Sequence, residues 1–167
     1  IRSPVCSTCV PSAALHRSGS VITWGNSYLG GNSSSVSNDL QSDVVQIFSA
    51  GSAFAALKED GSVISWGNSD RGGDSSGVSD QLQSGVAQIF SNTYSYAALK
   101  EDGSVITWGD TTYGGDSSSV SAQLQSGVSQ IFSSQEAFAA LKEDGSVITW
   151  GKSASGGNSS SVSDQLQ

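Results

Sequence analysis

Hydrophobic and polar residues alternate in short runs along this chain, and the runs return in the same order. In its third quarter the runs are GVAQIFS at 85–91, YAALKED at 96–102 and SVITWG at 104–109. Short runs with two-residue alternation and many β-branched or aromatic side chains are typical of half-buried β-strands. This part of the chain therefore predicts three short strands.

The first of these runs predicts a strand with two apolar faces. Strict alternation places Val86, Gln88 and Phe90 on one face. Ala87 and Ile89 then lie on the other face, because successive side chains of a strand point to opposite sides. A small sheet built this way needs a neighbour on each side to cover it.

The second and third runs predict a β-hairpin over 96–109. They are joined by Glu-Asp-Gly-Ser, in which Gly103 can adopt the positive φ of a tight turn and Asp102 is a good turn residue before it. The equivalent segments 54–67 and 138–151 predict two further hairpins.

A longer polar segment follows each hairpin, for example residues 110–127. Within it, 118–124 alternates weakly and predicts either an outer strand or a helical turn. No segment keeps the i, i+3, i+4 apolar spacing over three turns, which excludes a helical repeat. The Gly-Gly-Asp/Asn-Ser-Ser motif in this segment indicates a glycine-enabled bend, because one Asp or Asn in each copy is too little for calcium.

The whole pattern repeats every 42 residues, and one tryptophan marks each copy. The four units are 1–41, 42–83, 84–125 and 126–167. Three to four antiparallel strands per unit is the size of one propeller blade. We therefore predict an all-β, β-propeller-like fold with four blades, as a small closed ring or as an arc of a larger propeller. The tryptophans are expected to be core wedges between neighbouring sheets; they are Trp24, Trp66, Trp108 and Trp150.

The repeated SGVxQIFS, AALKEDGSVITWG pattern resembles the repeats of the regulator-of-chromosome-condensation family. It is especially similar to the propeller repeats of bacterial β-lactamase inhibitor protein II-like members, and to tandem arrays of unicellular marine algae. The similarity covers all four units. It implies a β-propeller, which in this family normally has seven blades, and a protein partner held by loops on one side of the propeller.

The four copies differ in two segments, one after IFS and one after WG. In an antiparallel meander both connections emerge at the same edge, so we expect them to form one variable rim, with the KEDG turns on the opposite edge. Loop drift explains the variation as well as selection for binding does, but the aromatic residues favour a binding rim. The candidate partner-binding residues are Tyr28, Leu29, Asp70, Arg71, Tyr94, Tyr113, Gln135 and Glu136.

The opposite edge predicts a row of carboxylates from the repeated Glu-Asp pairs at 59–60, 101–102 and 143–144. A surface that attracts basic partners and a plain solvated turn both fit; the turn is favoured because Arg17-Ser18 replaces the acids in the first unit without disturbing the frame. That unit also holds Cys6 and Cys9, which predict a local disulfide or two unpaired thiols. A zinc site would lack ligands, since His16 is the only histidine.

Composition and charge narrow the function classes. The formal net charge is −8 and the seven Lys and Arg residues are scattered, which disfavours nucleic acid and anionic membranes as partners. No run reaches the roughly 18–20 apolar residues of a membrane span. One histidine and acids confined to turns give no catalytic constellation, so we expect no enzyme, cofactor or metal.

The leading hypothesis is therefore a non-enzymatic protein-binding or scaffold module. One alternative is a structural accessory subunit of a large complex, for instance a photosynthetic or organellar membrane complex. A lectin-like propeller is the other, although it would need equivalent loops in every unit. Because the chain begins at Ile1 rather than Met, either a leader was removed or the sequence is incomplete. The compartment is therefore left open, with an organelle lumen or stroma and secretion as the candidates.

Overall fold

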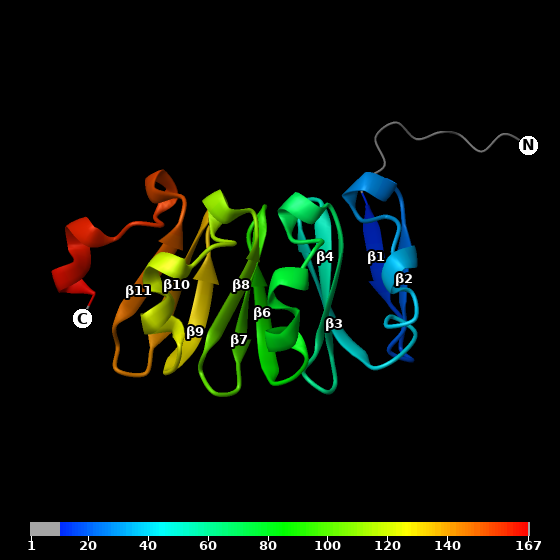
Figure 1. Cartoon of the computed structure of the whole chain (residues 1–167), viewed down its shortest axis with the longest axis horizontal. Coiled ribbons are helices and arrows are strands. Elements are labelled where there is room, and N and C mark those ends of the chain that lie inside the picture. Colours follow the sequence, from blue (N-terminus) through cyan, green and yellow to red (C-terminus); the bar gives the residue numbers. More distant parts are fainter. Residues whose placement is uncertain (1–10, 167) are drawn as a thin grey trace, which may run out of the picture.

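The computed structural model describes residues 11–166 and shows a row of small antiparallel sheets (Figure 1). Three sheets have three strands each, in the orders β3-β4-β5, β6-β7-β8 and β9-β10-β11, and a two-stranded sheet pairs β1 with β2. The strands are β1 (Ser12–Leu15), β2 (Val21–Trp24), β3 (Val44–Ala50), β4 (Ala53–Lys58), β5 (Val63–Gly67), β6 (Val86–Ser91), β7 (Ser95–Lys100), β8 (Val105–Gly109), β9 (Val128–Ser133), β10 (Ala137–Lys142) and β11 (Val147–Gly151). The prediction of an all-β propeller-like fold is confirmed, with three strands in each complete blade.

The predicted hairpins form in the expected register. In β7–β8, Tyr96 pairs with Trp108 and Leu99 with Val105. The turn between them is closed by Asp102, whose Oδ1 accepts hydrogen bonds from the Ser104 amide at 2.9 Å and from its hydroxyl at 2.6 Å. Gly103 takes φ 75°, which L side chains rarely adopt. The Asp-Gly turn thus sets the register of the hairpin, as the local sequence predicts.

The first strand of each complete blade does not alternate as predicted. Val86 and Ile89 pack in the same core cluster, whereas Phe90 packs in the next one. The reason is a β-bulge, since the register between β6 and β7 shifts between Val86 and Gln88. One extra residue reverses the sides of the residues beyond it. The prediction that Val86 shares a face with Gln88 and Phe90 is therefore wrong.

The segments after the hairpins form 3-10 helices and no outer strand. Over 118–124, where a strand and a helical turn were both open, the structure has helix η6. The helices are η1 (Ser27–Leu29), η2 (Ser34–Val36), η3 (Ser69–Arg71), η4 (Ser76–Leu82), η5 (Thr111–Tyr113), η6 (Ser118–Leu124), η7 (Ser153–Ser155) and η8 (Ser160–Gln165). Asp110 begins η5 by accepting from the Thr112 amide, and Gly114 ends it in the left-handed region. The predicted glycine bend therefore closes the first short helix of each unit, namely η1, η3, η5 and η7.

Neighbouring sheets pack face to face through apolar clusters that cross from one unit to the next. Trp66 stacks on Phe54 of its own sheet with 5.4 Å between ring centroids. Its Nε1 donates a 3.0 Å hydrogen bond to the Gly30 carbonyl of the preceding unit. Trp108 and Trp150 repeat this contact with Gly72 and Gly114. The tryptophans at these three positions are the predicted wedges.

Trp24 is an exception, and the prediction that it is core is wrong. Its side chain is 53% exposed, because the wedge contact is made with a preceding unit and no described residue occupies that place. The row is also open: its two ends lie at opposite sides of Figure 1, so the four sheets form an arc and no closed ring. Cys6 and Cys9 lie outside the described residues.

Candidate partner-binding rim

One edge of the arc carries all the variable loops. The helices η3, η5 and η7 follow the outer strands along the upper edge of Figure 1, and the hairpin turns lie along the lower edge. The loops after β3, β6 and β9 adjoin each other at the variable edge: the Ser91 hydroxyl donates to the Ser49 carbonyl at 2.9 Å, and the Thr93 amide to the Gln135 carbonyl at 3.3 Å. The two kinds of variable segment therefore share one rim.

Three of the candidate residues stack in a continuous row across two units. The Tyr94 and Tyr113 rings are stacked with centroids 4.2 Å apart. The guanidinium of Arg71, from the preceding unit, lies 4.2 Å from the Tyr94 ring centroid. A cation placed over an aromatic face is attracted by the ring quadrupole.

The row continues into the last unit through a second cation. Nζ of Lys152 lies 5.3 Å from the Tyr113 ring centroid and 2.8 Å from Oε2 of Glu136. The Ser155 hydroxyl donates to the same carboxylate at 2.7 Å. We call the six residues Arg71, Tyr94, Tyr113, Lys152, Glu136 and Ser155 the rim row. All six are half-buried.

A buried asparagine holds the two tyrosines in place. The Asn92 side chain is 7% exposed, and its Nδ2 donates to the Tyr113 carbonyl at 2.6 Å. Its Oδ1 accepts from the Tyr94 and Ser95 amides at 2.8 and 2.9 Å. The Ser95 hydroxyl lies within reach of both Asn92 Oδ1 and the Tyr113 carbonyl. These hydrogen bonds fix the backbone of the two loops that carry Tyr94 and Tyr113.

A serine takes the same position in the last unit. The Ser134 hydroxyl accepts from the Ala137 amide at 3.1 Å and lies 3.4 Å from the Ser155 carbonyl. It therefore links the loop of Glu136 to helix η7, as Asn92 links the loop of Tyr94 to η5. The second unit has Ala50 at this position, which has no side-chain polar group to form such a link.

The Glu136–Lys152 pair shifts both titrations toward the charged forms. The hydrogen bond from Lys152, followed by that from Ser155, holds the pKa of Glu136 below its ordinary value. The same hydrogen bond to Glu136 raises the pKa of Lys152. The rim row therefore contains an ion pair, Lys152 with Glu136, in which each partner favours the charged form of the other.

The remaining candidate residues lie on the rim but outside the row. The Tyr28 side chain is 84% exposed on η1, with Leu29 half-buried beside it. Asp70 is exposed next to Arg71. Gln135 is exposed and contacts the neighbouring loop through its backbone carbonyl.

Sequence reasoning missed four residues that the rim depends on. Lys152 begins the variable segment after WG and Ser155 ends it, and Asn92 and Ser134 begin the variable segments after IFS. The available signal was the type of residue: an Asn or Ser before a turn often accepts hydrogen bonds from the next backbone amides. Only the structure shows that Lys152 reaches Tyr113 and Glu136.

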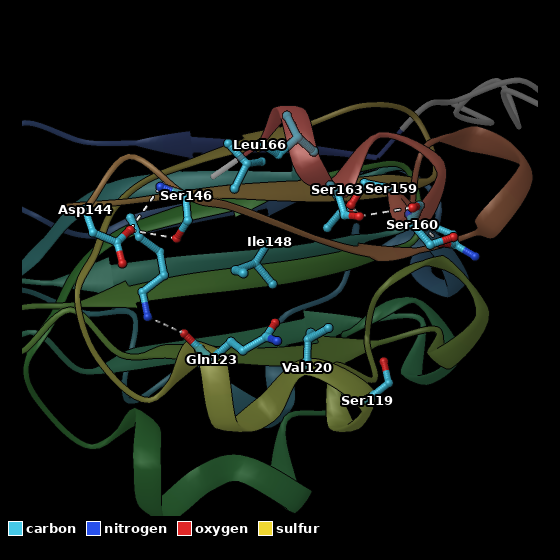
Figure 2. Close-up of a pocket in the computed structure, with 15 residues that line it drawn as sticks. Ser119, Val120, Gln123, Asp144, Ser146, Ile148, Ser159, Ser160, Ser163 and Leu166 are labelled. Carbon is cyan, nitrogen blue, oxygen red and sulfur yellow. Dashed lines mark hydrogen bonds between the residues drawn. The ribbon is translucent and has the colours of Figure 1, made fainter.

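A groove of about 830 Å³ lies beside the outer strand β11 (Figure 2). Ile148 forms its floor between Val120 of η6 and Leu166. A smaller groove of about 510 Å³ repeats beside β8 with the equivalent residues. Both charged side chains of the larger groove form internal hydrogen bonds: Lys142 Nζ donates to the Gln123 carbonyl at 3.0 Å, and Asp144 accepts from the Ser146 hydroxyl at 2.6 Å. These grooves belong to the repeated framework and not to the variable rim.

The carboxylates of the opposite edge are tied into their own turns. In each hairpin the Asp accepts two hydrogen bonds from the Ser two residues later. The side-chain hydrogen bond from that Ser is the main cause of the lowered pKa of Asp60, Asp102 and Asp144. Within residues 11–166 no group of three His, Cys, Asp or Glu residues is placed to hold a metal ion. The same part of the chain contains no helix long and apolar enough to cross a membrane.

Comparison with solved structures identifies the architecture. The fold matches Prp20p of Saccharomyces cerevisiae with TM-score 0.58 and 20% identity over 86% of this chain and 42% of that chain. It also matches human WBSCR16 (TM-score 0.53, 22% identity, 87% and 46%) and the ectodomain of the Arabidopsis thaliana receptor kinase ACR4 (TM-score 0.54, 18% identity, 87% and 50%). No protein-family model and no curated protein sequence matches the chain. The chain thus has an RCC1-type propeller fold and spans half or less of the length of these structures.

Proposed function

We propose that this chain, an arc of an RCC1-type propeller, is a non-enzymatic protein-binding module whose partner docks on the variable rim. The observation that supports it most is the rim row. It gathers side chains of three units into a stacked aromatic pair with a cation at each end. Tyrosine and arginine are enriched among residues that dominate protein–protein binding.

The solved neighbours support the general class of function. The structure of yeast RCC1 (Prp20) has been determined with Kap60 bound, and Prp20p has binding properties to Gsp1p and histones. We carry over protein binding and not these partners, because this chain covers 42% of Prp20 and shares 19–20% identity with it. The rim residues also come from the variable segments, so the partner is expected to be particular to this chain.

The form of the rim row favours one asymmetric partner. A lectin-like propeller with one ligand per blade would need the same side chains in each unit. The last residue of the 3-10 helix that follows the outer strand is instead Leu29, Arg71, Tyr113 and Ser155 in units 1 to 4. Four unlike side chains at equivalent places suit a single extended contact.

Site-specific photo-cross-linking tests which edge binds. A photoreactive amino acid is placed at Asp70 on the rim or at Glu101 in the opposite turn, both of which are exposed. Each protein is then irradiated in an extract of the native source. We expect a discrete cross-linked partner from position 70 and none from position 101. The same partner cross-linked equally from position 101 would contradict a rim-based site.

A substitution pair tests the residues. Tyr94→Ala combined with Tyr113→Ala removes the aromatic centre of the rim row, and we expect it to abolish capture of the cross-linked partner. Glu101→Ala combined with Glu143→Ala is the matched control on the opposite edge and should leave capture unchanged. Circular dichroism and thermal unfolding show whether each double variant keeps its fold. Full capture by a folded Tyr94, Tyr113 double variant would rule out the rim row as the binding site.

A further inference from the structure

We propose that Asn32 and Asn158 are acceptors for N-linked glycans. Each is the first residue of an Asn-Ser-Ser triplet, at 32–34 and 158–160. An asparagine followed two residues later by Ser or Thr, with no proline between them, is the acceptor motif for N-glycosylation. The other asparagines of the chain have neither Ser nor Thr at that distance; they are Asn26, Asn38, Asn68 and Asn92.

Both triplets expose the asparagine side chain in the same kind of turn. The Ser34 amide donates to Asn32 Oδ1 at 2.9 Å, and the Ser160 amide donates to Asn158 Oδ1 at 2.9 Å. A hydrogen bond from the amide two residues later forms an Asx turn. It uses the side-chain oxygen and leaves Nδ2, which carries two N–H groups, without a hydrogen-bond partner among the described residues.

The middle serine of each triplet ties the turn to the outer strand. The Ser33 hydroxyl lies 2.9 Å from the Thr23 hydroxyl of β2, and the Ser159 hydroxyl lies 2.9 Å from the Thr149 hydroxyl of β11. Both middle serines are half-buried, whereas the first and third residues of each triplet are exposed. The two positions that the motif specifies are thus open to solvent, and the position that it leaves free contacts the sheet.

The two inner units show that this turn is exposed even with a neighbouring sheet on each side. Asp74 and Asp116 occupy the places of Asn32 and Asn158, and both are exposed. Their units 2 and 3 pack against other units through both faces. The exposure of the two asparagines is therefore a property of the turn and does not depend on their units being the first and the last.

The inner units also show that the fold does not require asparagine at this position. Asp74 Oδ1 accepts from the Ser76 amide at 2.9 Å, and Asp116 Oδ1 accepts from the Ser118 amide at 2.8 Å. The turn therefore needs one side-chain oxygen, which either residue type supplies. Asparagine adds a nitrogen that the turn does not use, and this nitrogen is the atom to which a glycan is attached.

The reaction replaces one N–H bond of the asparagine by a bond to the sugar. Its co-reactant is an oligosaccharide carried on a lipid pyrophosphate, and an oligosaccharide transferase supplies the catalysis. A bond forms between Nδ2 and C1 of the first sugar, while the bond from C1 to the pyrophosphate oxygen breaks. Nδ2 loses one proton, and the lipid pyrophosphate leaves with the bonding electron pair. The proposal therefore places the chain in the secretory pathway, one of the compartments that the sequence leaves open.

Mass spectrometry of the protein from its native source tests this modification. Glycans are released with a peptide N-glycosidase in heavy-oxygen water, which converts a glycosylated asparagine into an aspartate that contains the heavy oxygen. We expect this label at positions 32 and 158, and the other asparagines are internal controls that should stay unlabelled. Unmodified asparagine at both positions would overturn the proposal, and unmodified asparagine at one would overturn it for that position.

Secretion of the chain from a cultured eukaryotic cell line tests the individual residues. We expect two glycans on the chain and the loss of one in Ser34→Ala. Ser33→Ala is the matched control, because it removes the contact with Thr23 but leaves the acceptor motif intact, so both glycans should remain. Asn32→Asp reproduces the turn of the inner units and should lose one glycan while it keeps the fold, which thermal unfolding checks. Two glycans on Ser34→Ala would contradict the role of Asn32.

The reverse substitution tests whether the exposed turn itself suits glycan attachment. Asp74→Asn completes the same triplet at 74–76 in an inner unit and should add one glycan to the secreted chain. Asp70→Asn is the control, because it is also exposed in that unit but is followed two residues later by Gly72. It should add none. If Asp74→Asn gains no glycan, the turn does not accept one and the proposal is wrong.

Discussion

At the scale of single residues, Tyr96 is buried where units 2 and 4 have Phe54 and Phe138. No described residue forms a hydrogen bond of good geometry with its hydroxyl. Burial raises the pKa of Tyr96 well above its usual range, and a backbone contact with Ala50 offsets only part of this. The hydroxyl is thus an uncompensated polar group in an aromatic position.

Tyr96→Phe should therefore leave the free energy of unfolding unchanged or raise it by up to about 1 kcal/mol, because a buried polar group without a partner is costly. Chemical denaturation measures the difference. The reverse change, Phe138→Tyr, is the matched control and should lower the free energy of unfolding by about 1–3 kcal/mol. A clear loss of stability in Tyr96→Phe would mean that the hydroxyl has a partner in solution.

The Glu136–Lys152 pair makes the stability of the folded protein depend on pH, and the direction of the pKa shift gives the sign. The pKa of Glu136 is lowered in the folded protein by Lys152 and Ser155. The pair therefore contributes stability above the ordinary Glu value of 4.5, and this contribution is lost as pH falls through the lower folded value. NMR titration of the Glu136 side chain should show an increase in its pKa in Lys152→Gln. Lys142→Gln is the control, because Lys142 donates its hydrogen bond to the Gln123 carbonyl instead. It should leave the titration of Glu136 unchanged.

At the scale of the elements, the bend after each outer strand depends on glycine at close backbone contact. A Cβ on Gly73 would lie 2.5 Å from the Gly67 carbonyl oxygen, whereas a Cβ on Gly77 would meet nothing within 4 Å. The two glycines lie in the same segment. They therefore separate the effect of crowding from that of the substitution itself.

Gly73→Ala should lower the free energy of unfolding by about 1–3 kcal/mol, the usual cost of overpacking, because the contact is with backbone that has little room to move. Gly77→Ala should be neutral or slightly stabilising, since alanine restricts the unfolded chain. Thermal or chemical unfolding of both variants provides the comparison. Equal effects at the two positions would show that the bend relaxes freely.

At the scale of the whole molecule, stability is expected to vary along the arc. Units 2 and 3 are covered on both faces, while unit 1 lacks a leading neighbour among residues 11–166 and unit 4 a trailing one. In a repeat array stability is roughly the sum of unit and neighbour terms, and regions with fewer apolar contacts open more easily.

Amide hydrogen exchange at low protein concentration should accordingly be slowest in β6–β8 and faster in β1–β2 and β9–β11. Uniform protection of all four sheets would show that the arc opens as one cooperative body.

Local sequence alone predicted the repeated body of this protein. Alternation, an Asp-Gly turn and a fixed spacing of tryptophans specify hairpins over 54–67, 96–109 and 138–151, because strand alternation and turn geometry depend on residues close in the chain. The same reasoning placed the variable segments on one rim. It failed at Val86, where a bulge interrupts the alternation.

Only the tertiary structure decided which side chains meet and which faces stay open. Tyr94 and Tyr113 are 19 residues apart, and Arg71 joins them from another unit. Such contacts depend on how far one sheet is rotated against the next, which no local pattern records. The exposure of Trp24 has the same origin, because its local SVITWG sequence is that of the buried Trp108 and Trp150, and the difference lies in what packs against it.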